Sequence, residues 1–290
     1  MKRVLVTGVN SYIGNAFIEY MRQYSADYSV EGISVRDEAW KKLDFSVYDC
    51  VFDVAGIAHA DTGHVSEAVK QQYYAVNTDL TISLAEKAKA GGVKQFIFMS
   101  SAIVYGNSAP IGSMKIITKD TEPAPADFYG DSKLQAEKGI MPLTDENFRI
   151  VILRPPMIYG KNSKGNYPTL STIAQKLPVF PKVDNCRSML YIGNLVEFVR
   201  LVIKNEEHGF FFPQNAEYSN TSELVKSIAE AHGKNIVLVD NTAWALKLVS
   251  HATGLVNKAF GSLAYDMSMS EYRENYRLYT LEESIRLTEG

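Results

Sequence analysis

Strand-like apolar runs alternate with segments of helical periodicity through the first half of the chain, and this alternation limits the possible folds most strongly. The runs are apolar almost throughout rather than at every second residue, which is typical of strands covered by helices on both faces. They are Val4–Thr7, Tyr28–Val35, Cys50–Ala55, Gln95–Ser100 and Arg149–Leu153. The sequence therefore predicts an α/β fold built on a doubly wound parallel sheet.

Helices are predicted between these strands from the spacing of apolar residues and from cap residues. They span Tyr12–Arg22, Val65–Ala90 and Asp127–Lys138. Too few residues separate Arg36 from Asp44 for a full crossover helix followed by a strand. We therefore predict a shortened crossover that ends in a brief third strand, Lys41–Phe45.

Composition argues against several classes of protein. The formal net charge of −3 argues against a nucleic-acid binder with a basic surface. The apolar runs are soon broken by charges, prolines or glycines, so no membrane span is predicted. Only two cysteines, Cys50 and Cys186, are present, which indicates a reducing, cytoplasmic setting rather than a disulfide framework. The first strand follows Met1 so closely that no signal peptide is expected.

The first strand leads directly into Thr7-Gly8-Val9-Asn10-Ser11-Tyr12-Ile13-Gly14 and then a helix. A tight glycine turn at this place lets backbone N–H groups and the helix N-terminus face a pyrophosphate. The alternative is an ordinary strand-to-helix turn that happens to hold two glycines. The position of the glycine motif directly after the first strand favours the dinucleotide-binding interpretation.

Residues after the second strand bear on the choice of dinucleotide. Sites that select NAD normally carry an acid here for the ribose 2′-hydroxyl, but this chain has Ser34 and Arg36. A guanidinium matches the geometry of a 2′-phosphate, which an acid would repel. NADP is therefore favoured over NAD, with a solvated surface arginine as the alternative.

A tyrosine and a lysine stand four residues apart at Tyr129 and Lys133. On a helix their side chains share one face. A phenol is a poor base at its ordinary pKa of about 10, and a nearby ammonium lowers that pKa. The pair therefore predicts a proton-transfer site, although one such spacing is expected by chance in a chain with 17 tyrosines.

With these motifs, the chain resembles the extended short-chain dehydrogenase/reductases of the NAD-dependent epimerase/dehydratase type. Their Thr-Gly-x-x-Gly-x-x-Gly motif matches with Ser11 in place of the middle glycine, and their Ser-Ser-x-x-Val-Tyr-Gly segment matches Ser100–Gly106. The resemblance implies a Rossmann-like sheet and a homodimer, commonly formed through the regions 65–90 and 127–138. It also implies that Ser101, Tyr129 and Lys133 are catalytic and that Asn77 supports the lysine. A strand-end cap is the alternative role for Ser101.

The resemblance extends to the binding residues and covers nearly the whole chain, through Leu153–Gly160, Arg187–Asn194 and Tyr279–Ile285. It implies a cofactor site formed by Gly8, Ser11, Tyr12, Ile13, Gly14, Ser34, Arg36, Asp44, Phe45, Val54, Ala55, Gly56 and Pro156. The candidate substrate-binding residues are Arg187, which matches a diphosphate-binding arginine, and Lys161, Asn166, Arg277 and His59. No His/Cys cluster has the spacing of a metal site.

The second half of the chain is less regular and is punctuated by prolines. The predicted elements are helices at Gly193–Lys204, Ser222–His232 and Thr242–Phe260 and strands at Phe210–Phe212 and Ile236–Val239. We expect a dinucleotide-binding domain at 1–160, to which about 186–212 also contributes. Residues 161–290 would form a small mixed α/β C-terminal substrate lobe interleaved with it.

The two residues after Ser101 narrow the reaction. Sugar-nucleotide 4,6-dehydratases of this family carry an Asp-Glu pair there, and GDP-fucose synthases carry a cysteine directly after the serine. Ala102 and Ile103 cannot transfer protons. The remaining expectation within the family is hydride transfer alone. The compact form and ending of the chain resemble reductases and epimerases that act on UDP-N-acetylhexosamines for surface polysaccharides, which implies hydride transfer at C4 of a nucleotide-activated sugar.

Two forms of this reaction stay open. In a 4-ketoreductase, NADPH delivers hydride to a keto sugar, whereas a 4-epimerase keeps a tightly bound NAD. Ile103 and Met157 differ from residues common in epimerases and, together with Ser34 and Arg36, favour the reductase. A non-catalytic NADP-binding regulator on the same fold is a further alternative. Such proteins typically lose the tyrosine or the lysine that this chain keeps.

Overall fold

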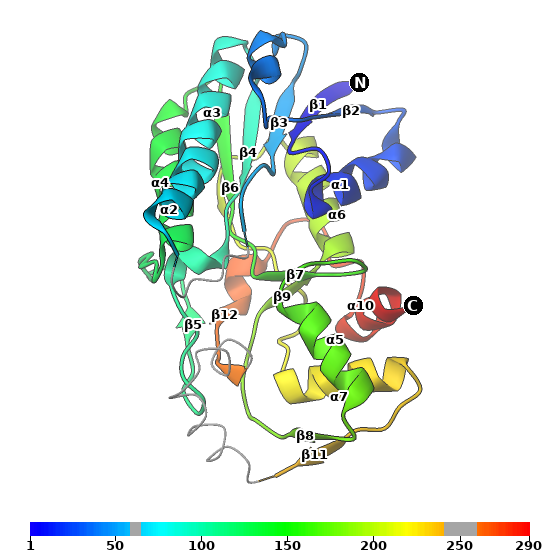
Figure 1. Cartoon of the computed structure of the whole chain (residues 1–290). Coiled ribbons are helices and arrows are strands. Elements are labelled where there is room, and N and C mark those ends of the chain that lie inside the picture. Colours follow the sequence, from blue (N-terminus) through cyan, green and yellow to red (C-terminus); the bar gives the residue numbers. More distant parts are fainter. Residues whose placement is uncertain (59–64, 241–259) are drawn as a thin grey trace. The chain divides into compact units, whose positions relative to one another are not determined.

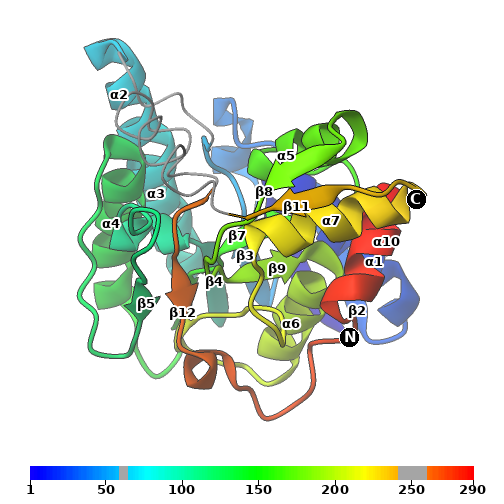
Figure 2. The same cartoon turned by 90° about the horizontal axis from the view of Figure 1, so that it is seen from below.

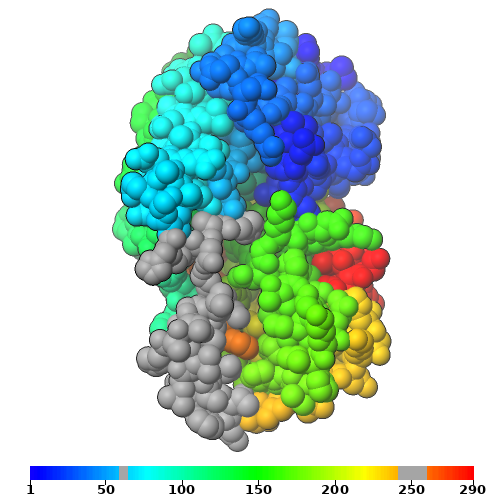
Figure 3. Space-filling model, in the orientation of Figure 1, coloured from blue at the N-terminus to red at the C-terminus, as the bar shows by residue number. Residues whose placement is uncertain are grey.

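The computed structural model describes residues 1–58, 65–240 and 260–290; the remaining residues are drawn in grey in Figure 3. The chain divides into two compact units, each assembled from three segments. Unit 1 comprises Met1–Gly106, Pro123–Pro155 and Val196–Phe212. Unit 2 comprises Asn107–Glu122, Pro156–Leu195 and Pro213–Gly290. The binding roles expected for the two parts of the chain stay predictions.

Unit 1 is built on a six-stranded sheet in which every pairing is parallel, in the order β10-β6-β4-β3-β1-β2 (Figure 1). The strands are β1 (Lys2–Thr7), β2 (Tyr28–Ile33), β3 (Cys50–Asp53), β4 (Gln95–Met99), β6 (Arg149–Leu153) and β10 (Gly209–Phe211). This arrangement confirms the predicted doubly wound parallel sheet.

Helices cover both faces of this sheet (Figure 1). One face carries α2 (Glu67–Tyr74), α3 (Leu80–Ala90) and α4 (Phe128–Ile140), and the other carries α1 (Tyr12–Met21) and the part of α6 (Ile192–Lys204) that belongs to unit 1. Coverage on both sides explains why the strands lack an alternating pattern: β3 and β4 are buried at every position.

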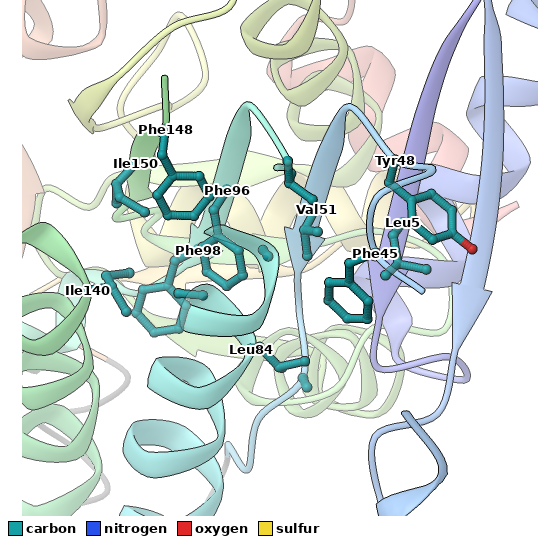
Figure 4. Packing of buried hydrophobic residues seen from close by; sticks show 14 of the residues in the cluster. Leu5, Phe45, Tyr48, Val51, Leu84, Phe96, Phe98, Ile140, Phe148 and Ile150 are labelled. Atoms are coloured by element: carbon teal, nitrogen blue, oxygen red, sulfur yellow. The ribbon is translucent and has the colours of Figure 1, made fainter. Parts of the chain in front are cut away.

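Large apolar side chains fill the space between the sheet and the α3/α4 face (Figure 4). Val51, Phe96 and Ile150 project from three neighbouring strands and are fully buried. Leu84 from α3 and Ile140 from α4 complete the layer, also with no exposed surface. Burial of such side chains contributes about 1.5–3 kcal/mol each, so this layer fixes α4, and with it Tyr129 and Lys133, against the sheet.

The predicted strand Lys41–Phe45 is wrong. A 3-10 helix occupies Glu38–Lys42, because the Asp37 carboxylate caps its N-terminus by accepting a hydrogen bond from Ala39 N at 2.9 Å. The Asp37 carboxylate therefore bonds the backbone of its own turn. Because residues 41–45 do not form a strand, β3 (Cys50–Asp53) is the third strand along the chain rather than the fourth, and residues 54–58 follow it.

The predicted single helix Val65–Ala90 is also wrong in one respect. A π-helical turn, Ala75–Asp79, separates α2 from α3. Two of its residues bond elsewhere in unit 1: Asn77 bonds Ile57, and Thr78 Oγ1 donates to Ser132 O at 2.7 Å. Asn77 and Thr78 make these tertiary contacts from the π-helical turn, which is wider than a turn of α-helix. Such π-helical turns are frequent at functional sites.

Unit 2 is a mixed α/β assembly of short elements. Its strands form three parallel pairs: β7 (Met157–Tyr159) with β9 (Met189–Tyr191), β8 (Val179–Pro181) with β11 (Val237–Val239), and β5 (Ile116–Ile117) with β12 (Ala264–Tyr265). Helices α5 (Asn166–Lys176), α7 (Thr221–Ala231) and α10 (Leu281–Glu289) accompany them (Figure 2). Tyr159, Tyr167 and Ile228 lie in its core.

Most of the predicted helix Thr242–Phe260 lies outside the described residues; Phe260 alone is described, and it is buried. Among the helices that the structure describes, none has the length and apolar character needed to cross a membrane.

Candidate active site

The order of strands reverses at β1 in unit 1, because β2 lies on one side of β1 and β3 on the other. Ligands of open parallel sheets bind outside the carboxyl ends of the strands at such a switch point. β1 ends at Thr7 and β3 at Asp53, and Thr7 Oγ1 donates to Asp53 Oδ1 at 2.5 Å. A ligand site is therefore expected at this end of the sheet.

The turn after β1 requires glycine at two positions. Gly8 has a φ of +79°, and a Cβ on it would lie 2.9 Å from both Cα and N of Ala55. A Cβ on Gly14 would lie 2.7 Å from Ser11 Oγ. At Gly8 the chain thus approaches the backbone of the loop after β3 more closely than a side chain would allow, as the tight first turn of a dinucleotide-binding motif requires.

Ser11 caps helix α1: its hydroxyl accepts a hydrogen bond from Gly14 N at 3.0 Å. The serine thereby satisfies one N–H of the first turn without lengthening the turn. The N-terminus of α1, with Tyr12 and Ile13 in its first turn, carries partial positive charge at the switch point. The glycine turn and the helix end fit the diphosphate of a dinucleotide.

Ser34 and Arg36 follow β2 and are both exposed, with Arg36 N donating to Ser34 Oγ at 3.4 Å. Val9 N donates to Ile33 O at 3.0 Å, so the end of β2 adjoins the glycine turn. Asp44 is exposed, and hydrogen bonds from Ser46 lower the pKa of its carboxyl.

Phe45, like Ala55, belongs to the buried hydrophobic core of unit 1. It is 2% exposed, and its ring lies 6.4 Å from that of Tyr48. Val54, Ala55 and Gly56 follow β3 beside the glycine turn, whereas Pro156 is the first residue of its segment in unit 2.

Helix α4 brings Tyr129 beside Ser101. Asp127 caps the helix by accepting from Gly130 N at 2.9 Å, and a Cβ on Gly130 would lie 2.9 Å from Ile103 O. The small residue lets α4 approach the 3-10 helix Ala102–Tyr105, whose N-cap is Ser101. Ser101 accepts from Ile103 N at 3.2 Å and also hydrogen-bonds the Tyr129 phenol, so it caps the turn and faces the tyrosine.

The pKa of Tyr129 is shifted upwards, whereas its spacing from Lys133 predicted a lowered pKa. Its removal from solvent raises its pKa to about 12, the Ser101 hydrogen bond offsets this only partly, and the charges of Tyr73 and Asp127 add to the rise. Lys133 does not lower this pKa as expected from the spacing, since its ammonium is directed to other groups.

Lys133 is 5% exposed and donates from Nζ to Met99 O at 2.9 Å, with Nζ 4.6 Å from the Phe98 ring centroid. Burial lowers its pKa to about 8, while the carboxylates of Asp53 and Glu137 raise it in part. A buried lysine poised near neutral pH is typical of functional sites.

Asn77, on the π-helical turn, is fully buried and fixes the loop after β3. Its Oδ1 accepts from Ile57 N at 2.8 Å, and its Nδ2 donates to Ile57 O and to Ser132 Oγ, both at 3.1 Å. A Cβ on Gly56 would lie 3.1 Å from Asn77 Oδ1 and 3.2 Å from Lys133 Nζ. Asn77, Gly56 and Lys133 therefore meet at one point.

The candidate substrate residues, apart from His59, lie in unit 2. Arg187 donates to Gly261 O at 2.9 Å, and burial lowers its pKa. Arg277 donates to Gln214 O at 3.1 Å and to Ser270 Oγ at 2.6 Å. Lys161 donates to Gly290 O at 3.2 Å, and Asn166 is the exposed first residue of α5. His59 lies outside the described residues.

Buried charged residues of unit 1 that were not singled out from the sequence include Asp53, Glu137 and Arg154. Asp53 is fully buried at the end of β3, where burial raises its pKa and bonds from Thr7 and Thr81 oppose the rise. Glu137 and Arg154 form a buried ion pair. A charge closing an otherwise apolar strand, as at Asp53 and Arg154, is the signal that could have found two of them.

The sequence matches known proteins over most of its length. Residues 4–211 match the model of the NAD dependent epimerase/dehydratase family. The chain is similar to a UDP-glucose 4-epimerase of Vibrio cholerae, with 30% identity over 99% of this chain and 94% of that protein.

Solved structures share the fold. The UDP-glucuronic acid 4-epimerase of Bacillus cereus, in complex with NAD, has a TM-score of 0.74 and 18% identity over 98% of this chain and 96% of its own. The dTDP-4-dehydrorhamnose reductase of Bacillus anthracis, in complex with NADP, has a TM-score of 0.65 and 20% identity over 84% and 86%.

The family match and the full-length relative define an enzyme that uses a nicotinamide dinucleotide. The chain belongs to the NAD dependent epimerase/dehydratase family.

Proposed function

We propose that this enzyme transfers hydride at C4 of a nucleotide-activated sugar. The observation that carries the proposal is the hydrogen bond between Ser101 and Tyr129, with Lys133 one turn further along the same helix, in the unit that also holds the Gly8 turn. The nicotinamide ring, when bound, supplies the hydride acceptor or donor. No other chemistry is required of the cofactor.

Different side chains then bind the C4 oxygen and transfer its proton. The Ser101 hydroxyl holds the C4 oxygen, and the Tyr129 phenol exchanges the proton of that oxygen as hydride leaves or returns. Lys133, one helical turn after Tyr129 on α4, supplies a positive charge to the site below its pKa of about 8. Asn77 holds the loop after β3, with Gly56, beside the lysine.

Epimerisation at C4 is the first form of this reaction. The relative from Vibrio cholerae, similar over nearly the full length of both chains, is a UDP-glucose 4-epimerase. An epimerase removes hydride from C4 and returns it to the other face, so it retains its dinucleotide through many turnovers. UDP-glucose and UDP-N-acetylglucosamine are the substrates to test first.

Reduction of a 4-keto sugar is the second form, and two observations favour it. Ser34 and Arg36 are exposed after β2, beside the glycine turn, where a 2′-phosphate of NADP would be recognised. Ile103, next to the serine segment, offers no hydroxyl to the sugar. A reductase releases its oxidised dinucleotide after each turnover.

One experiment separates the two forms. The freshly purified protein is heat-denatured, and the released dinucleotide is identified by mass spectrometry. Near-stoichiometric NAD supports the epimerase and contradicts the role of Ser34 and Arg36. Little retained dinucleotide, with NADPH binding more tightly than NADH, supports the ketoreductase.

Two further parts of the proposal concern binding. The guanidinium groups of Arg187 and Arg277 would bind the substrate diphosphate, since a guanidinium can hold phosphate oxygens bidentately. A homodimer would form through the regions 65–90 and 127–138, in which Tyr74 and Asp131 are joined by a 2.8 Å hydrogen bond. Light scattering tests the dimer, and a lower substrate affinity of Arg187→Ala and Arg277→Ala tests the diphosphate site.

A further inference from the structure

A buried ion pair lies one helical turn beyond Lys133. Glu137 on α4 is 2% exposed, and Arg154 after β6 is 7% exposed. The pair is bidentate: Arg154 Nη2 donates to Glu137 Oε2 at 2.6 Å and Nε donates to Oε1 at 3.1 Å. Burying two charges is expensive, and a pair of apolar residues often stabilises a fold equally well. The pair therefore calls for an explanation other than stability.

Both members of the pair hold the segment that carries Ser101. Ser100 Oγ donates to Glu137 Oε1, and Arg154 Nη1 donates to the Tyr105 hydroxyl at 2.6 Å. Ser100 directly precedes Ser101, and Tyr105 ends the 3-10 helix that Ser101 caps. The segment is thus held on both sides of the serine.

Arg154 is itself fixed in place. Its guanidinium carbon lies 5.1 Å from the ring centroid of Tyr105 and 4.6 Å from that of Phe210. The backbone on each side of it is tied to the same segment, by Ser100 N to Leu153 O at 2.8 Å and by Ala102 N to Pro155 O at 2.9 Å. Glu137, in contrast, belongs to the helix of Tyr129 and Lys133.

We propose that Glu137 and Arg154 are positioning residues that set the placement of the Ser101 hydroxyl against the Tyr129 phenol. The ion pair joins the helix of the tyrosine to the segment of the serine through Ser100 and Tyr105. This inference rests on the proposed function, because it assigns a task to the geometry of that site. Small errors of placement reduce catalysis strongly.

Ser100→Ala is the most selective test, since it removes one link and leaves the ion pair intact. Loss of a buried hydrogen bond to a charged group predicts a fall in kcat of about tenfold or more, with KM and the dinucleotide Kd unchanged. Ser284→Ala, which removes a buried serine bonded to Tyr159 in unit 2, is the matched control and should leave kcat unchanged. Equal kcat values for the two variants would overturn the proposal.

A double-mutant cycle tests whether Ser100 acts through Ser101. In the Ser101→Ala background, Ser100→Ala should cause no further loss of kcat, because the group it positions is absent. Multiplied losses would mean a merely structural role. If Tyr129→Phe keeps full activity, the proposed function itself fails; if Tyr129→Phe is inactive but Ser100→Ala matches the control, only the positioning fails.

A readout without substrate completes the test. Hydrogen–deuterium exchange of the peptide 100–106 should be several-fold faster in Ser100→Ala than in the wild type, while exchange in α4 is unchanged. The combined variant Glu137→Gln/Arg154→Met, which leaves no unpaired buried charge, should show the same faster exchange in a folded protein. Unchanged exchange in both variants would contradict the proposal.

Discussion

Lys133 is the residue whose charge most directly links the stability of unit 1 to its chemistry. Its ammonium is buried and bonded to a backbone carbonyl, with Asp53 and Glu137 as the opposing charges. Burial outweighs these carboxylates, so its pKa of about 8 in the fold lies below its ordinary value of 10.5. The fold therefore opposes a charge that the proposed reaction uses.

Lys133→Met should raise the free energy of unfolding at pH 7 and abolish turnover. The penalty on the buried ammonium is fully present below the folded pKa of about 8 and is relieved as pH rises from 8 to 10.5. The stability gain of the variant should therefore shrink through that window. Urea unfolding at pH 7, 9 and 10.5 measures it; a variant less stable than wild type at pH 7 would contradict the argument.

Gly8→Ala should weaken dinucleotide binding and lower the stability of unit 1. The φ of +79° costs about 1–2 kcal/mol for an L-residue, and the new Cβ would also meet the Ala55 backbone at 2.9 Å. Gly92→Ala is the control, because Gly92 has a φ of +80° but nothing within 4 Å. Thermal unfolding and NADPH titration compare them. Equal losses in both variants would show that close approach at Gly8 is unimportant.

At the scale of the elements, the pattern of apolar residues predicted the strands and helices that pack in layers. It missed the short turns that are held by hydrogen bonds of single side chains. The strands β1, β3, β4 and β6 are continuous apolar runs, which local sequence reveals directly. The 3-10 helix after Asp37 and the π-helical turn around Asn77 depend on individual side chains. The partners of Asn77 lie 20 and 55 residues away, beyond any local pattern.

Asn77→Ala should destabilise unit 1 by about 1–3 kcal/mol, because it leaves the N–H and C=O of Ile57 without their partner. The loop after β3 would lose its attachment to the π-helical turn, so dinucleotide binding should weaken as well. Denaturant unfolding and NADPH titration measure the two effects. Wild-type values in both would show that the turn does not hold this loop.

At the scale of the whole molecule, unit 1 is completed by a late segment of the chain. β10 forms the sixth strand of the sheet and pairs with β6. Gln95 donates from Nε2 to Val202 O at 3.1 Å and to Glu207 O at 3.0 Å. Strand β4 is therefore held by the last segment of unit 1, Val196–Phe212, which comes after two segments of unit 2 along the chain. The alternation of the first half could not reveal this dependence, although a contribution from about 186–212 was expected.

A fragment of residues 1–160 should therefore fail to fold cooperatively. It lacks β10 and the buried face of α6, including Phe198 and Val202. Exposed apolar strands would favour aggregation instead. Circular dichroism during heating tests this prediction: a sharp two-state transition in the soluble fragment would show that the first 160 residues are an independent domain.

The candidate site was predictable to the extent that its residues lie in short motifs. The glycine turn, Ser101, and Tyr129 with Lys133 were found from spacing and resemblance, and the structure gathers them in unit 1. The pKa of Tyr129 was not predictable, because it depends on burial and on where Lys133 is directed. The ion pair of Glu137 and Arg154 joins distant segments and gave no local pattern.

Tyr129→Phe tests the central claim most directly. The substrates are UDP-glucose and UDP-N-acetylglucosamine with NAD for epimerisation, and the corresponding 4-keto sugar nucleotides with NADPH for reduction. Loss of the phenol proton should reduce kcat by roughly 10²–10⁴-fold, while dinucleotide binding and thermal stability remain those of the wild type. Unchanged kcat in a variant that still binds the dinucleotide would contradict the account, because the proton would then have to move through another group.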